Sequence, residues 1–167
     1  MQLPQPTKEH AWLKRFVGEW THSCEMQCAP DQPPVKLTGT ERARAVGDIW
    51  VVAEGEGRMP MGGTAYTCLT LGYDPAKGRI VATWYGSMMT HLWVYERGAI
   101  DFAANRLTLE ASGPSFCADG KMEEGKTANY REVIEFQSDD ARTFTSSVQG
   151  PDGSWTQMMQ LHYKRVK

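Results

Sequence analysis

The chain has 167 residues, of which 18 are Lys or Arg and 20 are Asp or Glu, so its formal net charge is −2. This balance lacks the basic excess with which proteins bind nucleic acid or an anionic membrane surface. A mean hydropathy of −0.49, without a long apolar run, excludes a membrane-spanning helix. The length fits one domain over residues 1–167, with enough chain to bury a substantial core.

The first residues, Met1 to Pro6, carry neither the basic nor the apolar region of a secretory signal. We therefore expect a cytoplasmic protein. Its four cysteines are then expected to stay reduced, because the cytosol keeps thiols from pairing.

The first predicted element is a short helix over residues 7–17. Thr7 follows a proline and suits the N-cap position, and Gly18 suits the position just after the helix, where a left-handed residue ends it. Between them, Trp12, Phe16 and their neighbours fall on one apolar stripe.

The rest of the chain, residues 18–165, alternates between strand-like segments and turns. Trp20, His22, Cys24 and Met26 form the clearest run of period two. About nine or ten short strands are predicted, near residues 19–26, 36–46, 49–58, 64–73, 79–85, 91–97, 106–111, 129–137, 142–149 and 154–164. The segment 113–127 is the longest that reads as irregular, as a lid or a mobile loop would.

So many short, closely connected strands favour a mainly β fold in which one antiparallel sheet closes into a barrel and loses its edges. A barrel of this size can hold one small ligand. The helix is then expected to plug one end of the barrel.

Gly18-Glu19-Trp20, at the start of the first strand and just after a helix, resembles the opening motif of the calycins, the lipocalin and fatty-acid-binding superfamily. The resemblance implies that Gly18 and Trp20 form the barrel floor. A basic residue of the last strand, Lys164 or Arg165, is placed to stack on that tryptophan.

Three later segments resemble a bacterial family of uncharacterised calycin-like proteins, the domain-of-unknown-function family 1579. They are residues 57–63, 71–74 and 83–88. The similarity covers about residues 12–163, nearly the whole chain. It implies a barrel fold and no established activity. The family often carries an Asp where this chain has Gly86, so a role for that carboxylate does not transfer.

Trp84, His91 and Trp93 are the first candidates for binding a ligand. His91 and Trp93 share a strand face, and Trp84 lies on the preceding strand. Aromatic side chains at alternate positions suit an apolar pocket wall, and they suit an ordinary barrel core equally well. His91 could orient a ligand through one hydrogen bond.

Four more residues complete the predicted ligand-binding set: Tyr66, Glu54, Arg131 and Met158. Glu54 lies where its strand changes from apolar to charged, as at a cavity rim. Arg131 could bind a ligand carboxylate bidentately, but the pattern of its strand leaves open which way it points. Met158 belongs to a methionine pair near a strand end, and methionine adapts to varied apolar ligands.

No metal or cofactor is predicted. His22, Cys24 and Cys28 are the one cluster with ligand-type side chains, and no second cluster completes a tetrahedral site. The outline also resembles nitrobindin, a haem-binding barrel whose iron is held by a His on the last strand. In this chain Met158 and Gln160 fall near that position and His162 is displaced from it.

The leading functional hypothesis is a barrel that binds a small apolar molecule. One alternative is an isomerase or dehydratase with His91 or Glu54 as base, although no catalytic motif is present and no catalytic residue is assigned. Further alternatives are a haem-binding protein and a homodimeric interaction module that pairs through a sheet face rich in Trp.

Overall fold

The computed structural model describes residues 3–26, 35–59, 62–117 and 121–166. Within these ranges the chain forms one short helix, a 3-10 turn and eleven strands. The helical elements are α1 (Lys8–Leu13) and η1 (Lys14–Phe16). The strands are β1 (Gly18–Met26), β2 (Val35–Val46), β3 (Trp50–Arg58), β4 (Thr64–Asp74), β5 (Arg79–Gly86), β6 (Trp93–Tyr95), β7 (Arg97–Asp101), β8 (Arg106–Phe116), β9 (Met122–Ser138), β10 (Ala141–Gln149) and β11 (Trp155–Arg165).

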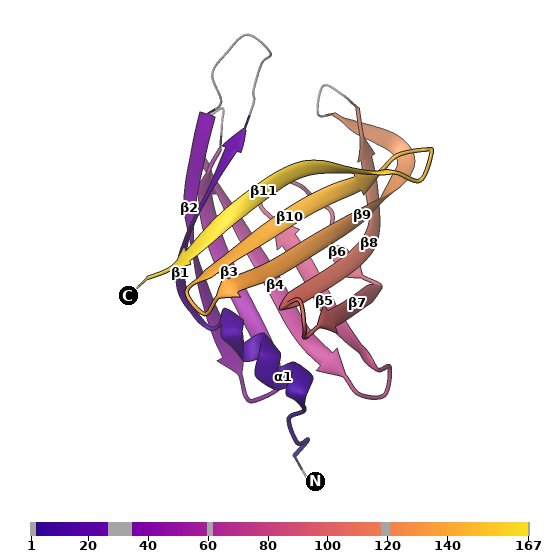
Figure 1. Cartoon of the computed structure of the whole chain (residues 1–167). Coiled ribbons are helices and arrows are strands. Elements are labelled where there is room, and N and C mark those ends of the chain that lie inside the picture. The colour runs from indigo at the N-terminus through magenta and orange to yellow at the C-terminus, as the bar shows by residue number, and fades with distance from the viewer. Residues whose placement is uncertain (1–2, 27–34, 60–61, 118–120, 167) are drawn as a thin grey trace.

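The strands form a single antiparallel sheet in the order β6-β5-β4-β3-β2-β1-β11-β10-β9-β8-β7. β1 pairs with β11, so the first and last strands of the chain lie side by side as the sheet curls into a barrel (Figure 1). The predicted antiparallel barrel is confirmed. It has eleven strands rather than nine or ten in the described part of the chain, because the strand predicted near 91–97 corresponds to β6 and is followed by a further strand, β7, that was not predicted.

The barrel nearly closes where the two ends of the sheet meet, at β6 and β7. Only Glu96 separates these strands in the sequence, and the Arg79 guanidinium of β5 donates a hydrogen bond to its carbonyl oxygen. Gly98 of β7 lies against Ile80 of β5, where an added Cβ would be 2.8 Å from the Cβ of Ile80. Glycine is required here because the two strands approach so closely.

The helical segment lies across one end of the barrel, as expected (Figure 1). It is shorter than predicted: the α-helix ends at Leu13, the 3-10 turn ends at Phe16, and Val17 is already extended. Gly18 adopts a φ of +136°, and the Arg165 side chain occupies the space that a Cβ at this position would need. Phe16, at the end of the helical segment, is fully buried and packs in the core.

Strict alternation along the strands separates the barrel interior from its outer face. On β9 the side chains of Tyr130, Glu132, Ile134 and Phe136 are buried, whereas the residues between them are only partly buried. The residues of β8 and β10 that pair with these buried residues share the same inward face.

The segment 113–127, predicted as irregular, belongs largely to these strands. β8 continues to Phe116 and β9 begins at Met122, with Gly113 paired to Ala128. The prediction was wrong because the small and polar residues there lack the apolar alternation that marks a strand, while backbone pairing extends through them.

Cys24 is buried, Cys68 is half-buried and Cys117 is exposed, and all three are free thiols. Cys28 lies outside the described residues. The described part of the chain contains no helix that is long and apolar enough to span a membrane.

Candidate functional site

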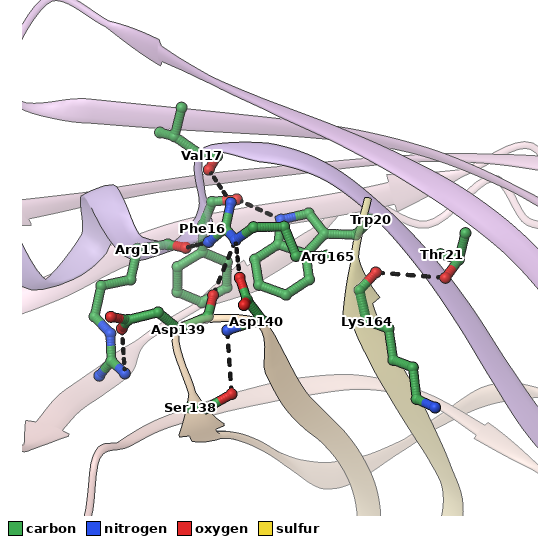
Figure 2. Close-up of polar contacts among 10 residues, drawn as sticks. All are labelled: Arg15, Phe16, Val17, Trp20, Thr21, Ser138, Asp139, Asp140, Lys164 and Arg165. Atoms are coloured by element: carbon green, nitrogen blue, oxygen red, sulfur yellow. Dashed lines mark hydrogen bonds and ion pairs between the residues drawn. The ribbon is translucent and has the colours of Figure 1, made fainter. Parts of the chain in front are cut away.

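Trp20, fully buried, forms the floor of the barrel together with the end of the helical segment. Its indole Nε1 donates a 2.7 Å hydrogen bond to the Phe16 carbonyl oxygen. The Arg165 guanidinium carbon lies 4.1 Å from the centroid of the Trp20 ring. Of the two basic residues considered from the sequence, Arg165 is thus the one that stacks on the tryptophan, and the Lys164 side chain points away from it (Figure 2).

Arg165 also ties the floor to the strands around it. Its guanidinium donates hydrogen bonds to the carbonyl oxygens of Val17 at 2.7 Å, Arg15 at 2.9 Å and Asp139 at 2.9 Å (Figure 2). These carbonyls lie at the end of the helical segment and in the β9–β10 turn. One side chain therefore closes this end of the barrel by satisfying three backbone acceptors.

A second arginine, which unlike Arg165 is fully buried, lies just inside the floor. The Arg142 side chain is 3% exposed and forms an ion pair with Glu41, which is 11% exposed. The Arg142 guanidinium carbon lies 4.7 Å from the ring centroids of Phe16 and Trp20 and 4.2 Å from that of Tyr163. Aromatic faces and a carboxylate thus surround this cation, which compensates for its removal from water.

Glu132 lies higher in the barrel, paired with Leu109 of β8 and Ser146 of β10. It is 7% exposed. Ser146 Oγ donates a 3.1 Å hydrogen bond to Oε1, whereas Oε2 meets no hydrogen-bond partner among the described residues. Burial raises the pKa of Glu132 to about 8, and the Ser146 hydrogen bond offsets part of that rise. The carboxyl group is therefore mostly protonated at neutral pH.

Aromatic side chains line the interior beyond Glu132. Trp93 packs edge-to-face against Tyr130 at 4.7 Å and against His91 at 5.0 Å between ring centroids. Its indole Nε1 donates to Met89 Sδ at 3.3 Å. The buried Nε2 of His91 has no hydrogen-bond partner in the described part of the chain. The structure therefore brings together the predicted pair His91 and Trp93.

Four apolar side chains of the inner wall pack against the core yet stay only partly buried. They are Leu69, Trp84, Phe144 and Leu161. Leu69 pairs with buried Ala53 and Phe144 pairs with buried Ile134, so both share the inward face of their strands. Because these side chains point inward, the surface they leave accessible borders the interior, and water reaches the space inside the barrel at this level.

Two of the predicted ligand-binding residues, Glu54 and Tyr66, lie on the outer face of the sheet. Glu54 follows buried Ala53, and Tyr66 follows buried Ala65; in both cases the inward position is the preceding residue. Tyr66 is 59% exposed. Neither side chain therefore faces the interior to which the predicted ligand-binding set was assigned, and Glu54 is not positioned as a base for a reaction inside the barrel.

Arg131 also points outward, which settles the direction that the sequence left open. Its guanidinium lies 2.8 Å from Glu110 Oε1 and packs over the Trp155 ring at 4.0 Å. Met158 has no partner on β10, because the pairing shifts at this bulge from Met159 directly to Gln157. It is 52% exposed. Neither side chain contributes to the inner wall where Trp84 lies.

The last strand presents Tyr163 and Leu161 inward, since they pair with inward-facing Arg142 and Phe144. His162 is exposed on the opposite face. The haem alternative expects a histidine ligand from this strand, and Tyr163, Leu161 and Met159, which pairs with inward-facing Ser146, are not histidines. Among the described residues, no group of three or more His, Cys, Asp or Glu side chains is close enough to hold a metal ion.

Sequence reasoning missed Glu132, Arg142 and Glu41 as interior residues. The signal for Glu132 was present, because it alternates with Tyr130 and Ile134 on the same strand. Both faces of this strand carry apolar and charged residues, so the alternation alone did not show which residues point into the barrel.

The chain belongs to the family described as "Protein of unknown function (DUF1579)", whose model matches residues 5–165. No curated protein matches it. The crystal structure of Rv2717c from M. tuberculosis superposes with a TM-score of 0.59 and 12% identity, covering 98% of this chain and 100% of that chain. The S-type phycobiliprotein lyase CPES from Guillardia theta superposes with a TM-score of 0.52 and 16% identity, covering 98% and 99%. At these identities the likeness shows a shared barrel fold.

Proposed function

We propose that this barrel binds a small, mostly apolar molecule in its interior. The observation that carries the proposal is the set of inward-facing apolar side chains that water still reaches: Leu69, Trp84, Phe144 and Leu161. A ligand that covers them removes apolar surface from water, at roughly 25 cal/mol for each Å² buried. The barrel fold shared with the two solved structures supports an interior site.

The polar groups nearby suit a ligand that is not purely hydrocarbon. His91 Nε2 and Glu132 Oε2 are buried and lack hydrogen-bond partners within the described residues. A few well-placed polar groups in a mainly apolar lining are typical of ligand sites. Trp84, His91 and Trp93 therefore remain the proposed ligand-binding residues, joined by Glu132.

Filling the interior tests this proposal. Leu69→Trp adds bulk on the inward face of β4, and Thr70→Trp adds the same side chain at the next residue, which faces outward. The probe is 2-ethylnaphthalene, and the measurement is the rise in melting temperature with probe concentration, since binding to the native state stabilises it. We expect a rise for the unmodified protein and for Thr70→Trp, and none for Leu69→Trp.

Two results would contradict the proposal. One is the absence of any stabilisation of the unmodified protein by this probe. The other is equal stabilisation of both tryptophan variants, which would place the bound probe outside the barrel. A loss of folding in Leu69→Trp is recognised by its far-UV circular dichroism, and Leu161→Trp then replaces it on the opposite wall.

A further inference from the structure

Glu132 is the buried acid of the interior that lacks a charged partner of its own. Arg142, nearer the floor, has Glu41 as its ion-pair partner and is enclosed by aromatic rings, although its Nε atom is buried without a hydrogen-bond partner among the described residues. The Glu132 carboxyl instead receives one hydrogen bond, from Ser146 to Oε1, and its Oε2 is left without a partner among the residues that the structure describes. A buried polar group in this state costs folding free energy that a ligand can recover.

We propose that Glu132 donates a hydrogen bond from Oε2 to an uncharged acceptor, such as a ketone or ester carbonyl oxygen, on the ligand inside the barrel. This inference rests on the proposed function and narrows it to apolar molecules that carry such an acceptor. The donor is a carboxylic acid, so the preference exists only while Glu132 holds its proton.

The surroundings favour an uncharged acceptor over an organic cation. Ionising Glu132 in this environment is unfavourable, because burial is the largest influence on its pKa and raises it. A bound ammonium group would need that ionisation and would also lose its own water, at a cost of several kcal/mol for each buried ion. A carbonyl group needs neither.

Several other titratable groups of the interior also have pKa values shifted by burial. Tyr95 on β6 and Tyr130 on β9 lie near enough for Glu132 to act on their charge, and burial raises the pKa of both above the ordinary tyrosine value. Burial also raises the pKa of Tyr163 and of Cys24, and it lowers that of His22. The other buried or partly buried titratable groups at the interior and its floor are Arg142, Glu41, His91 and His10. The pKa of Glu132, raised by burial to about 8, lies between about pH 7 and about pH 9, and the Glu132→Gln variant separates its contribution from that of the other interior groups.

Three probes with one naphthalene body test the proposal: 2-acetylnaphthalene, 2-ethylnaphthalene and 2-(2-aminoethyl)naphthalene. The first carries a carbonyl acceptor, the second lacks it, and the third is a cation. Dissociation constants are measured by quenching of tryptophan fluorescence from about pH 7 to about pH 9. We expect the affinity of the acetyl probe, relative to the ethyl probe, to fall about tenfold over this range as Glu132 loses its proton.

Two substitutions of Glu132 sharpen the test. Glu132→Gln keeps a donor that cannot ionise, so the preference for the acetyl probe should persist and no longer depend on pH. Glu132→Leu removes the donor, so the preference should fall about tenfold at pH 7. Glu135→Gln, on the outward face of the same strand, is the matched control and should behave as the unmodified protein. The carbonyl stretching frequency of bound 2-acetylnaphthalene should be lower in the unmodified protein than in Glu132→Leu.

The outcomes separate this inference from the proposed function. If the ethyl probe binds inside the barrel but the acetyl preference is unchanged in Glu132→Leu and at high pH, the hydrogen-bond role is overturned while interior binding stands. If the aminoethyl probe binds most tightly, gains affinity with rising pH and loses it in Glu132→Gln, the site is one for cations. If no probe binds, the proposed function itself fails.

Discussion

The floor of the barrel and the level of Glu132 bury charge-bearing groups in opposite ways. At the floor, Arg142 meets Glu41 and the faces of three aromatic rings, Phe16, Trp20 and Tyr163. At the level above, Glu132 is equally buried but is held by one hydroxyl group. The floor keeps its charge because its partners are built in, whereas Glu132 stays mostly neutral because it has none of that kind.

This difference indicates that, within one barrel interior, the Arg142–Glu41 pair serves stability whereas Glu132 is a candidate for ligand binding. At the floor the Arg142 cation has a carboxylate partner and is covered by aromatic rings, so its charge is compensated within the protein. A lone carboxyl beside a solvent-reached apolar wall has an unused hydrogen-bonding position. Breaking the first should therefore cost stability, and changing the second should alter how stability and binding depend on pH.

The largest effect is expected from Arg142→Met at the floor. The substitution leaves the Glu41 carboxylate buried without its cation and should lower the free energy of unfolding by about 3–5 kcal/mol. Urea denaturation measures this loss. The double variant Arg142→Met with Glu41→Leu removes both charges and should recover most of it. A single variant that loses less than about 1 kcal/mol would show that the pair is not effectively buried.

A smaller effect, with a defined pH dependence, is expected from Glu132→Gln. The unfolded chain releases the Glu132 proton near the ordinary pKa, whereas the folded protein keeps it until about pH 8. Between these values the native state binds more protons, so the free energy of unfolding falls as pH rises, by at most about 1.4 kcal/mol per pH unit. Below this window both states are protonated, and above it both are ionised, so the difference is constant there.

The comparison between the unmodified protein and Glu132→Gln isolates this contribution. Their unfolding free energies, measured in urea from about pH 5 to about pH 9, should diverge with the glutamine variant becoming relatively more stable, by on the order of 3 kcal/mol in total. Parallel curves would mean that Glu132 titrates normally in the folded protein, which would remove the contrast with the floor.

The sequence predicted the barrel because its signals are local. Period-two alternation from Trp20 to Met26 and the turn residues between strands specify an antiparallel sheet without knowledge of contacts. The prediction for Gly18 held only in part: its φ is positive, but extended Val17 separates it from the helical segment, and it begins β1 instead of ending the helix.

The interior side chains were harder to predict because inward and outward faces both carry polar residues. Arg131 and Glu132 are adjacent, and only the pairing of β9 with its neighbours shows that the glutamate enters the barrel while the arginine pairs with Glu110 outside. The direction of Glu54 was equally hard to predict, because from this residue onward neither face of its strand carries apolar side chains. Which of two neighbouring charges is buried depends on register, and register is set by strands distant in the sequence.

The smallest loss of stability is expected from replacing Arg165, which contacts the barrel floor but is not part of the Arg142–Glu41 pair. Arg165→Ala removes the guanidinium from the Trp20 ring and leaves the carbonyl oxygens of Arg15 and Val17 without their donor. These groups lie near the surface, where water can replace part of the loss, so we expect destabilisation of about 2 kcal/mol, less than for Arg142→Met.

Lys164→Ala, at the exposed neighbouring position, is the matched control and should change stability by less than about 0.5 kcal/mol. Arg165→Lys should lie between the two, because lysine keeps the charge but lacks the planar fork that reaches several carbonyls at once. If Arg165→Lys were as stable as the unmodified protein, charge alone would hold this end of the barrel and the hydrogen bonds to Arg15 and Val17 would contribute little.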